Sequence, residues 1–121
     1  MSMVDTIRAA LGTLYTGKCD VIEHRPVKDG HITRSEEITV LTDQPCRLSF
    51  DSIPAADNAD GGGAALTQVT KLFLPPGVSI RPGSKITVTQ NGQTTAYSQS
   101  GQPAVYESHI EITLQLFKRW A

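Results

Sequence analysis

One dipeptide, Asn91-Gly92, constrains the fold of this chain more than any other feature. It lies between two segments in which apolar and polar residues alternate. A two-residue type I′ turn needs positive φ at both central positions, and Asn followed by Gly adopts it at the least steric cost. Counting outward predicts three pairs on one half-buried face, which are Gln90 with Gln93, Val88 with Thr95 and Ile86 with Tyr97. The sequence therefore predicts an antiparallel hairpin.

Turn signals and short alternating segments predict strands along most of the chain. The turns Pro75-Pro76-Gly77, Pro82-Gly83 and Ser100-Gly101 separate strands expected at 67–74, 78–81, 85–98, 103–106 and 108–119. The last strand should place Ile110, Ile112, Leu114 and Leu116 in the core with Ile86 and Val88. The expected fold is all-β, a small antiparallel barrel or sandwich, in a single domain over 1–121.

The first half of the chain predicts three more strands. The first runs over 18–25, where Pro26 ends it, and the second over 36–41, with Ile38 and Val40 inward. A bulge or an edge position is expected at 42–45, because Pro45 cannot donate to a ladder. The third strand then places three further residues inward, which are Cys46, Leu48 and Phe50.

One short helix is predicted within 1–17. Ser2 can cap it, and Asp5 follows three residues later, where an acid favours the positive end of the helix dipole. Four apolar residues recur on one face at helical spacing, namely Val4, Ile7, Leu11 and Leu14. We expect this stripe to pack on the sheet or on a neighbouring subunit.

Composition excludes several classes of protein. A net charge of −1 over 121 residues provides no overall electrostatic surface for nucleic acid. Cys19 and Cys46 could meet on neighbouring strands, but without a secretory signal we predict free, buried thiols. No apolar stretch approaches the roughly 18 residues of a membrane span, so we expect a soluble chain that is intracellular when synthesised.

The segment from Asp51 to Leu66 differs from the rest. DSIPAADNADGGGAAL has three aspartates, a glycine triplet and almost nothing to bury, so it cannot offset its own ordering entropy. We predict a long mobile loop. Such a loop is either a solvated connection without a role or a segment that acts in an assembly.

Residues for catalysis are not found in a recognisable pattern. His24, His31 and His109 lack metal-ligand spacing and are expected at the surface or at strand edges, with His109 paired to Glu111. Gly61, Gly62 and Gly63 do not form a phosphate loop, because no Gly-Lys-Ser/Thr follows and no helix begins there. Asp51, Asp57 and Asp60 could attract a divalent ion but have no fixed geometry. We expect no enzyme, no metal and no cofactor.

A barrel that binds single-stranded nucleic acid is an alternative, because small barrels often do so. It would need aromatic residues in a basic groove. The one basic-aromatic cluster is Lys118, Arg119 and Trp120, which is better explained as a strand end that contacts a partner.

Three stretches resemble small head–tail connector proteins of tailed bacteriophages and prophages of Gram-positive bacteria. These are PCRLSF (45–50) with the segment that follows it, KLFLPPGVSIRPGSKITVTQNG (71–92) and SGQPAVYESHIEITL (100–114). The related proteins are of the head-closure or stopper type and are also called minor capsid proteins. The resemblance extends from about Lys18 to the C-terminus.

The resemblance implies a ring of about six or twelve copies below the portal and adaptor. Such a ring retains the packaged double-stranded DNA and provides a docking surface for the tail, so its partners are portal, adaptor and tail proteins of the same phage. By position, the loop with Asp51, Asp57, Asp60 and Gly61–Gly63 would close the channel, and its carboxylates would repel DNA phosphates. The chain would belong to the virion and would be present in the host cytoplasm during assembly, away from membranes. The alternative is a tail-completion or tail-terminator ring protein.

Overall fold

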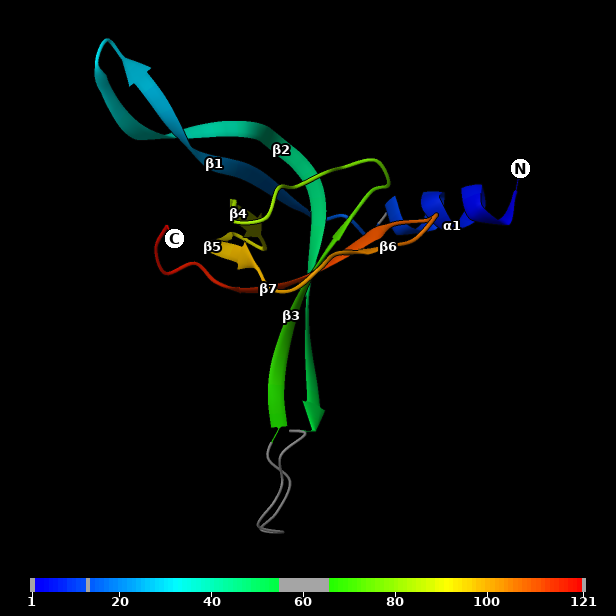
Figure 1. Cartoon of the computed structure of the whole chain (residues 1–121). Helices are drawn as coiled ribbons and strands as arrows, with labels where there is room; N and C mark the ends of the chain where they lie inside the picture. Colours follow the sequence, from blue (N-terminus) through cyan, green and yellow to red (C-terminus); the bar gives the residue numbers. More distant parts are fainter. Residues whose placement is uncertain (1, 13, 55–65, 121) are drawn as a thin grey trace.

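The computed structural model describes residues 2–12, 14–54 and 66–120. They form one helix and seven strands, all paired antiparallel (Figure 1). The elements are α1 (Met3–Gly12), β1 (Gly17–Asp29), β2 (Ile32–Pro54), β3 (Leu66–Leu74), β4 (Lys85–Gln90), β5 (Gln93–Gln99), β6 (Ala104–Val105) and β7 (Ile110–Leu116). The predicted all-β class with one short N-terminal helix is confirmed.

The sheet closes into a ring in the order β3-β2-β1-β4-β5-β7, and β7 pairs back to β3. β7 closes the ring because its first part pairs with β3 and its last part pairs with β5. The short strand β6 lies beside the start of β7. The expectation that the last strand is central is therefore confirmed.

The Asn91-Gly92 hairpin has the predicted register, with Gln90 opposite Gln93 and Ile86 opposite Tyr97. Both turn residues have positive φ, 53° at Asn91 and 74° at Gly92. A left-handed conformation at both positions is what a type I′ turn requires, so the dipeptide determines the register locally.

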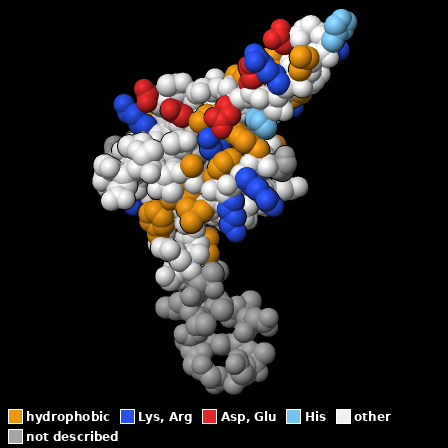
Figure 2. All heavy atoms as spheres, turned by 90° about the vertical axis from the view of Figure 1, so that its left-hand side faces the viewer, with side chains coloured by type: hydrophobic (Ala, Val, Ile, Leu, Met, Phe, Trp, Pro, Cys, Tyr) orange, Lys and Arg blue, Asp and Glu red, His pale blue; other side chains and the backbone are white. Residues whose placement is uncertain are grey.

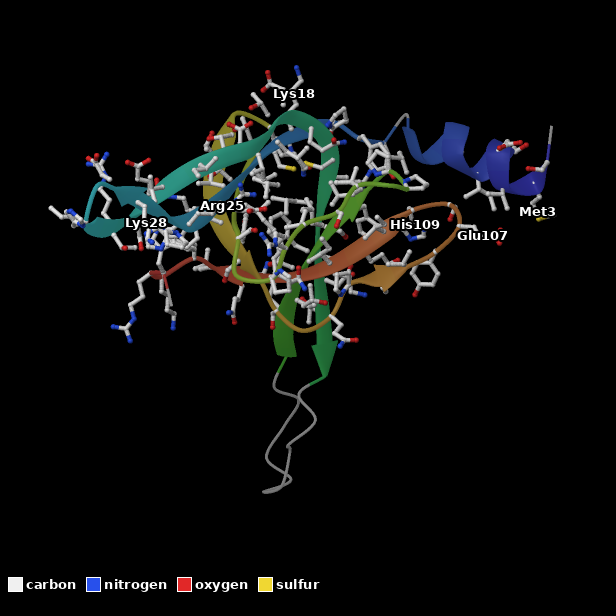
Figure 3. All side chains as sticks on the ribbon, turned by 45° about the horizontal axis from the view of Figure 1, so that its top comes forward. Met3, Lys18, Arg25, Lys28, Glu107 and His109 are labelled. Atoms are coloured by element: carbon white, nitrogen blue, oxygen red, sulfur yellow. The ribbon has the colours of Figure 1, made fainter. Side chains whose placement is uncertain are left out.

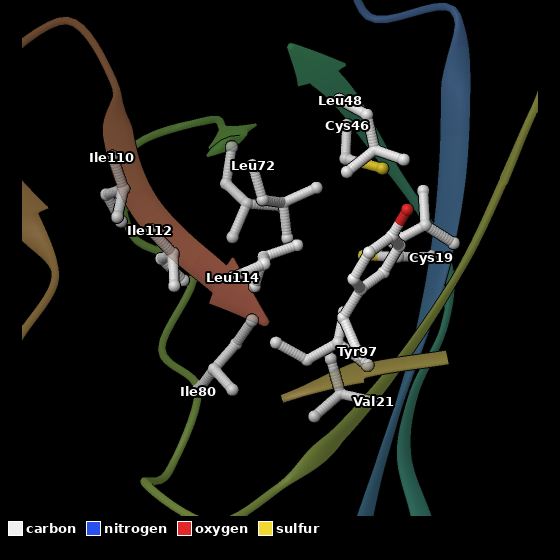
Figure 4. Close-up of a cluster of buried hydrophobic side chains, with 13 residues drawn as sticks. Cys19, Val21, Cys46, Leu48, Leu72, Ile80, Tyr97, Ile110, Ile112 and Leu114 are labelled. Atoms are coloured by element: carbon white, nitrogen blue, oxygen red, sulfur yellow. The ribbon is translucent and has the colours of Figure 1, made fainter. Parts of the chain in front are cut away.

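One contiguous core fills the ring (Figure 4). Its buried apolar side chains are Cys19, Val21, Cys46, Leu48, Leu72, Leu74, Ile80, Ile86, Val88, Tyr97, Ile110, Ile112 and Leu114. Of the residues predicted to point inward on β4 and β7, only Leu116 is exposed, at 62%. Leu116 pairs with Tyr97 at the end of β7, where β3 no longer lies beside the strand, so its side chain is largely exposed.

Several predictions about individual strands are wrong. β1 does not end at Pro26 but continues to Asp29, which is possible because β1 has a partner on one side only beyond Ile22. Phe50 lies on the same face of β2 as Leu48, as predicted, but it is 53% exposed instead of buried. Residues 78–81 form no strand, although Ile80 is buried in the core.

Bulges in β2 confirm the interruption predicted near Pro45. They also explain why Val40, which was predicted to point inward, does not. The register with β1 shifts between Cys19 and Val21, opposite Thr42 and Asp43. Asp43 has a φ of 51°, and its N–H donates to Asp20 Oδ1 at 2.9 Å. A second shift leaves Val40 without a partner, and its side chain is 37% exposed instead of inward.

The side-chain amide of Gln90 links β4 to β2 near the start of β1. Leu48 N–H donates to Gln90 Oε1 at 2.8 Å, and Gln90 Nε2 donates to the Leu48 carbonyl at 3.2 Å. Gly17 lies directly beneath, and a Cβ there would be 2.9 Å from Gln90 Oε1. Gln90 thus substitutes for a strand pairing between β2 and β4, and this arrangement requires glycine at position 17.

Both cysteines are free and buried, as predicted. The hydrogen bond with Cys46 and burial in the core raise the pKa of the Cys19 thiol. Among the residues placed by the structure, no helix is long and apolar enough to cross a membrane.

Candidate assembly surfaces

Three segments project from the barrel (Figures 1 and 3). The first is the ribbon, which we define as residues 23–29 of β1 with residues 32–38 of β2. The second is the arm, residues 51–54 of β2 with residues 66–69 of β3, and the third is α1. Each is positioned by a strand or a chain end that continues past its neighbours in the ring.

The arm replaces part of the loop predicted over Asp51–Leu66. Asp51 is not in a loop but pairs with Val69, and the pairing continues to Pro54 opposite Leu66. The prediction missed this extension because its few apolar residues do not indicate a strand, whereas the backbone ladder from the barrel simply continues. Asp57, Asp60 and Gly61–Gly63 lie outside the described residues.

The root of the arm exposes both acidic and apolar groups. Asp51 is exposed and follows Phe50, whose side chain is 53% exposed. Figure 2 shows hydrophobic side chains at the surface where the arm leaves the barrel. The root of the arm therefore presents apolar surface next to a negative charge.

The ribbon is rich in charge, as the projection at the top of Figure 2 shows. Arg25 Nε donates to Glu23 Oε1 at 2.7 Å, and Arg34 is 2.8 Å from Glu36. Glu23 is the one buried carboxylate of this segment, and Arg81 lies 3.8 Å from its Oε1. Apart from Glu37, the other charged side chains of the ribbon are exposed or half-buried at the surface, where ion pairs contribute little to folding.

The C-terminal residues 117–120 fold back on the base of the ribbon. Trp120 stacks on His24, with ring centroids 4.8 Å apart, and its Nε1–H donates to Glu37 Oε1 at 3.0 Å. Lys85 Nζ donates to the same oxygen at 3.0 Å and lies over the rings of Phe117 and Trp120. These hydrogen bonds, first from Lys85 and then from Trp120, lower the pKa of Glu37.

The predicted contact residues at the C-terminus thus differ in their surroundings. Trp120 is half-buried against its own chain, whereas Lys118 and Arg119 are exposed. Contact of this cluster with a partner stays a prediction, and it would involve mainly the two basic side chains.

The three histidines lie where they were expected. His31 is exposed at the tip of the ribbon, and His24 is exposed beside Trp120. His109 Nε2 is 3.0 Å from Glu111 Oε1, and the ring stacks on Tyr106 at 4.9 Å between centroids (Figure 3). In the part of the chain that is described, no three His, Cys, Asp or Glu residues are grouped to hold a metal ion.

The helix α1 has the predicted cap but not the predicted packing. Asp5 N–H donates to Ser2 Oγ at 3.1 Å, and Ser2 Oγ donates to the Asp5 carboxylate at 2.9 Å. The helix ends at Gly12 rather than at residue 17. No described Cα of α1 lies within 8 Å of a strand, so packing of the stripe on its own sheet is not observed among the described residues. Packing on a neighbouring subunit stays a prediction, and Met3 and Ile7 are exposed for it.

Comparison with known proteins supports a fold rather than a family. No protein-family model matches the chain, and no curated protein matches its sequence. Its structure is similar to a solved structure described as the phage-like element PBSX protein xkdH from Bacillus subtilis. The TM-score is 0.51 at 12% sequence identity, and the match covers 82% of this chain and 91% of that chain. At this identity, the likeness shows a shared fold.

Proposed function

We propose that this chain is a structural protein of the head–tail connector of a tailed phage or prophage. In this proposal, copies form a ring below the portal and adaptor, retain the packaged DNA and provide a docking surface for the tail. One observation supports it above all: a closed barrel with projecting segments has the same fold as a protein of the phage-like element PBSX.

The projecting segments fit a role in assembly better than a role in catalysis. The ribbon, the arm and α1 expose charge and apolar surface that the barrel does not cover. Surfaces of this kind mark contacts with other proteins. The chain would then act without a cofactor and without enzymatic activity.

The arm is the proposed gating or docking element. It ends at residues 54 and 66, and the chain between them contains Asp57, Asp60 and Gly61–Gly63. Together with the exposed Asp51, repetition of these carboxylates around a ring would repel DNA phosphates in the channel. Glycines would allow the segment to change conformation during DNA ejection.

The test is to replace residues 55–65 by a tight glycine-containing turn in a producing phage or prophage. Particles should lose packaged DNA or fail to join tails, whereas the purified variant should melt close to the parent because loop length affects stability only logarithmically. A matched variant, Asp57→Asn with Asp60→Asn, keeps the length and removes the charge. Infectious particles with retained DNA after the replacement would contradict the proposed role of the arm.

A tail-completion ring protein is the second candidate, because a ring-forming barrel with projections also suits that position. Particles made without the chain separate the two roles. Heads that leak DNA indicate head closure, whereas DNA-filled heads beside unjoined or misassembled tails indicate tail completion.

Self-association of the pure chain is expected to be weak. The described surface has no long exposed apolar strand, so little area is available for a tight interface between copies. Light scattering should show a monomer or a loose oligomer, with rings forming on a portal–adaptor assembly. A stable ring of the pure protein at micromolar concentration would contradict this expectation.

A further inference from the structure

The outer edge of β2 along the ribbon has no neighbouring strand among the described residues. β1 pairs with one edge of β2 from Ile32 to Cys46, and β3 reaches the other edge only from Arg47 to Pro54. In Figure 1 the ribbon extends clear of the barrel. Such an edge presents backbone N–H and C=O groups that can pair with another chain.

Only part of this edge is regular enough to pair. The bulges at Val40 and at Thr42–Asp43 distort the strand, and Pro45 lacks an N–H. Devices of this kind prevent edge-to-edge association. Ile32–Thr39 remains as a regular and accessible stretch.

The sequence of this stretch, ITRSEEI over 32–38, is complementary to itself when it is read in the opposite direction. In an antiparallel pair centred on Ser35, Arg34 of one copy faces Glu36 of the other, and Ile32 faces Ile38. Because side chains alternate along a strand, these four residues share one face. The two-fold symmetry places both charge pairs and both apolar pairs on that face.

Three of these four side chains are well exposed in the single chain, and Ile38 is half-buried. The exposed fractions of the Arg34 and Glu36 side chains are 60% and 42%, and Ile32 is 69% exposed. Within one chain, Arg34 already lies 2.8 Å from Glu36. Pairing with a second copy would extend this ion pair into an alternating network of two arginines and two carboxylates, which is favourable between opposed strands.

Glu37 is on the opposite face of β2, so it does not compete with Glu36 for an arginine of the second copy. Its carboxylate accepts hydrogen bonds from Lys85 and Trp120. The C-terminal residues therefore occupy the face that contains Glu37, while the face with Arg34 and Glu36 is available to a second copy.

We propose that the free protein forms a two-fold dimer by antiparallel pairing of Ile32–Ile38 with the same segment of a second copy. The contact is isologous, so it closes at two copies and does not extend into a ring. It is small, so the dimer should be weak and sensitive to salt. The proposal does not depend on the proposed connector function.

Charge reversal tests the pairing by sedimentation equilibrium at low salt. Arg34→Glu and Glu36→Arg should each weaken dimerisation by roughly tenfold or more, because like charges then face each other twice. Mixing the two variants should restore association, since the two acidic side chains of one variant would face the two basic side chains of the other. Lys28→Glu, which changes a charge on β1 instead of the open edge, is the matched control and should dimerise like the parent.

Cross-linking provides a second test that does not depend on the charge variants folding. Ser35→Cys places two thiols opposite each other at the two-fold axis, whereas Thr33→Cys faces position 37. Under mild oxidation, Ser35→Cys should form covalent dimers much faster than Thr33→Cys.

Three results would overturn the proposal. The first is a parent chain that stays monomeric at high concentration and low salt, and the second is faster cross-linking through Thr33→Cys. The third is association of this edge only with another protein, which would assign the edge to a different partner.

Discussion

The two halves of β1 differ in the number of neighbouring strands and in the burial of their side chains. Over Lys18–Ile22 it lies between β2 and β4, and Cys19 and Val21 are almost fully buried. Over 23–29 it keeps only β2, and most side chains are exposed or half-buried. The backbone pairing is the same, but only the barrel half buries apolar surface, so folding stability should be concentrated there.

The sharpest test of this contrast is within β7. Leu114→Ala should lower the free energy of unfolding by about 2–5 kcal/mol, because its buried side chain would leave a cavity in the core. Leu116→Ala, two residues further on the same strand, should cost far less, since that side chain is 62% exposed. Urea unfolding of both variants measures the difference, and equal losses would contradict the assigned core.

Variants of Gln90 test whether the barrel depends on the two hydrogen bonds between the Gln90 side chain and the Leu48 backbone. Gln90→Ala should cost about 1–3 kcal/mol, because two backbone groups of Leu48 lose their partner. Gln93→Ala, across the turn at an exposed position, is the control. Gly17→Ala should be less harmful in the Gln90→Ala background, where its closest obstacle is absent. Additive losses in this double-mutant cycle would argue against the bridge.

The contact between the C-terminal residues and the ribbon predicts a smaller, pH-dependent effect. The pKa of Glu37 is lowered in the folded chain, so its contribution is present above the ordinary value of 4.5 and is lost as the pH falls through the lowered value. Glu37→Gln should melt below the parent at neutral pH, and the difference should shrink in acid. Trp120 is the sole tryptophan, so its fluorescence should report the loss of its contact with Glu37 as the pH falls. Asp29→Asn is the control, and a difference that persists in strong acid would contradict the assignment.

Removal of residues 1–12 should have the smallest effect. Because no described Cα of α1 lies within 8 Å of a strand, the truncated chain should retain the barrel's stability to within about 0.5 kcal/mol. Thermal melting followed by circular dichroism measures this. A loss as large as that of Gln90→Ala would mean that the helix packs on its own barrel in solution.

Local signals in the sequence were sufficient where one residue type satisfies one geometric need. Asn91-Gly92 determined the hairpin and its register, and Ser2 with Asp5 determined the start of the helix. The alternation along β7 also predicted the buried face up to Leu114. Each of these features depends on neighbours within a few residues, so a single sequence contains the information.

Only the tertiary structure decided where the ring ends and the projections begin. Phe50, Val40 and Leu116 continue an inward pattern, but Val40 lies at a bulge, and Phe50 and Leu116 each have a neighbouring strand on one side only. The ladder beyond Pro26 and the arm beyond Asp51 depend on backbone pairing with distant residues and not on side-chain alternation. Burial depends on which strands lie alongside, and that is set by closure of the ring between β7 and β3, residues far apart in the sequence.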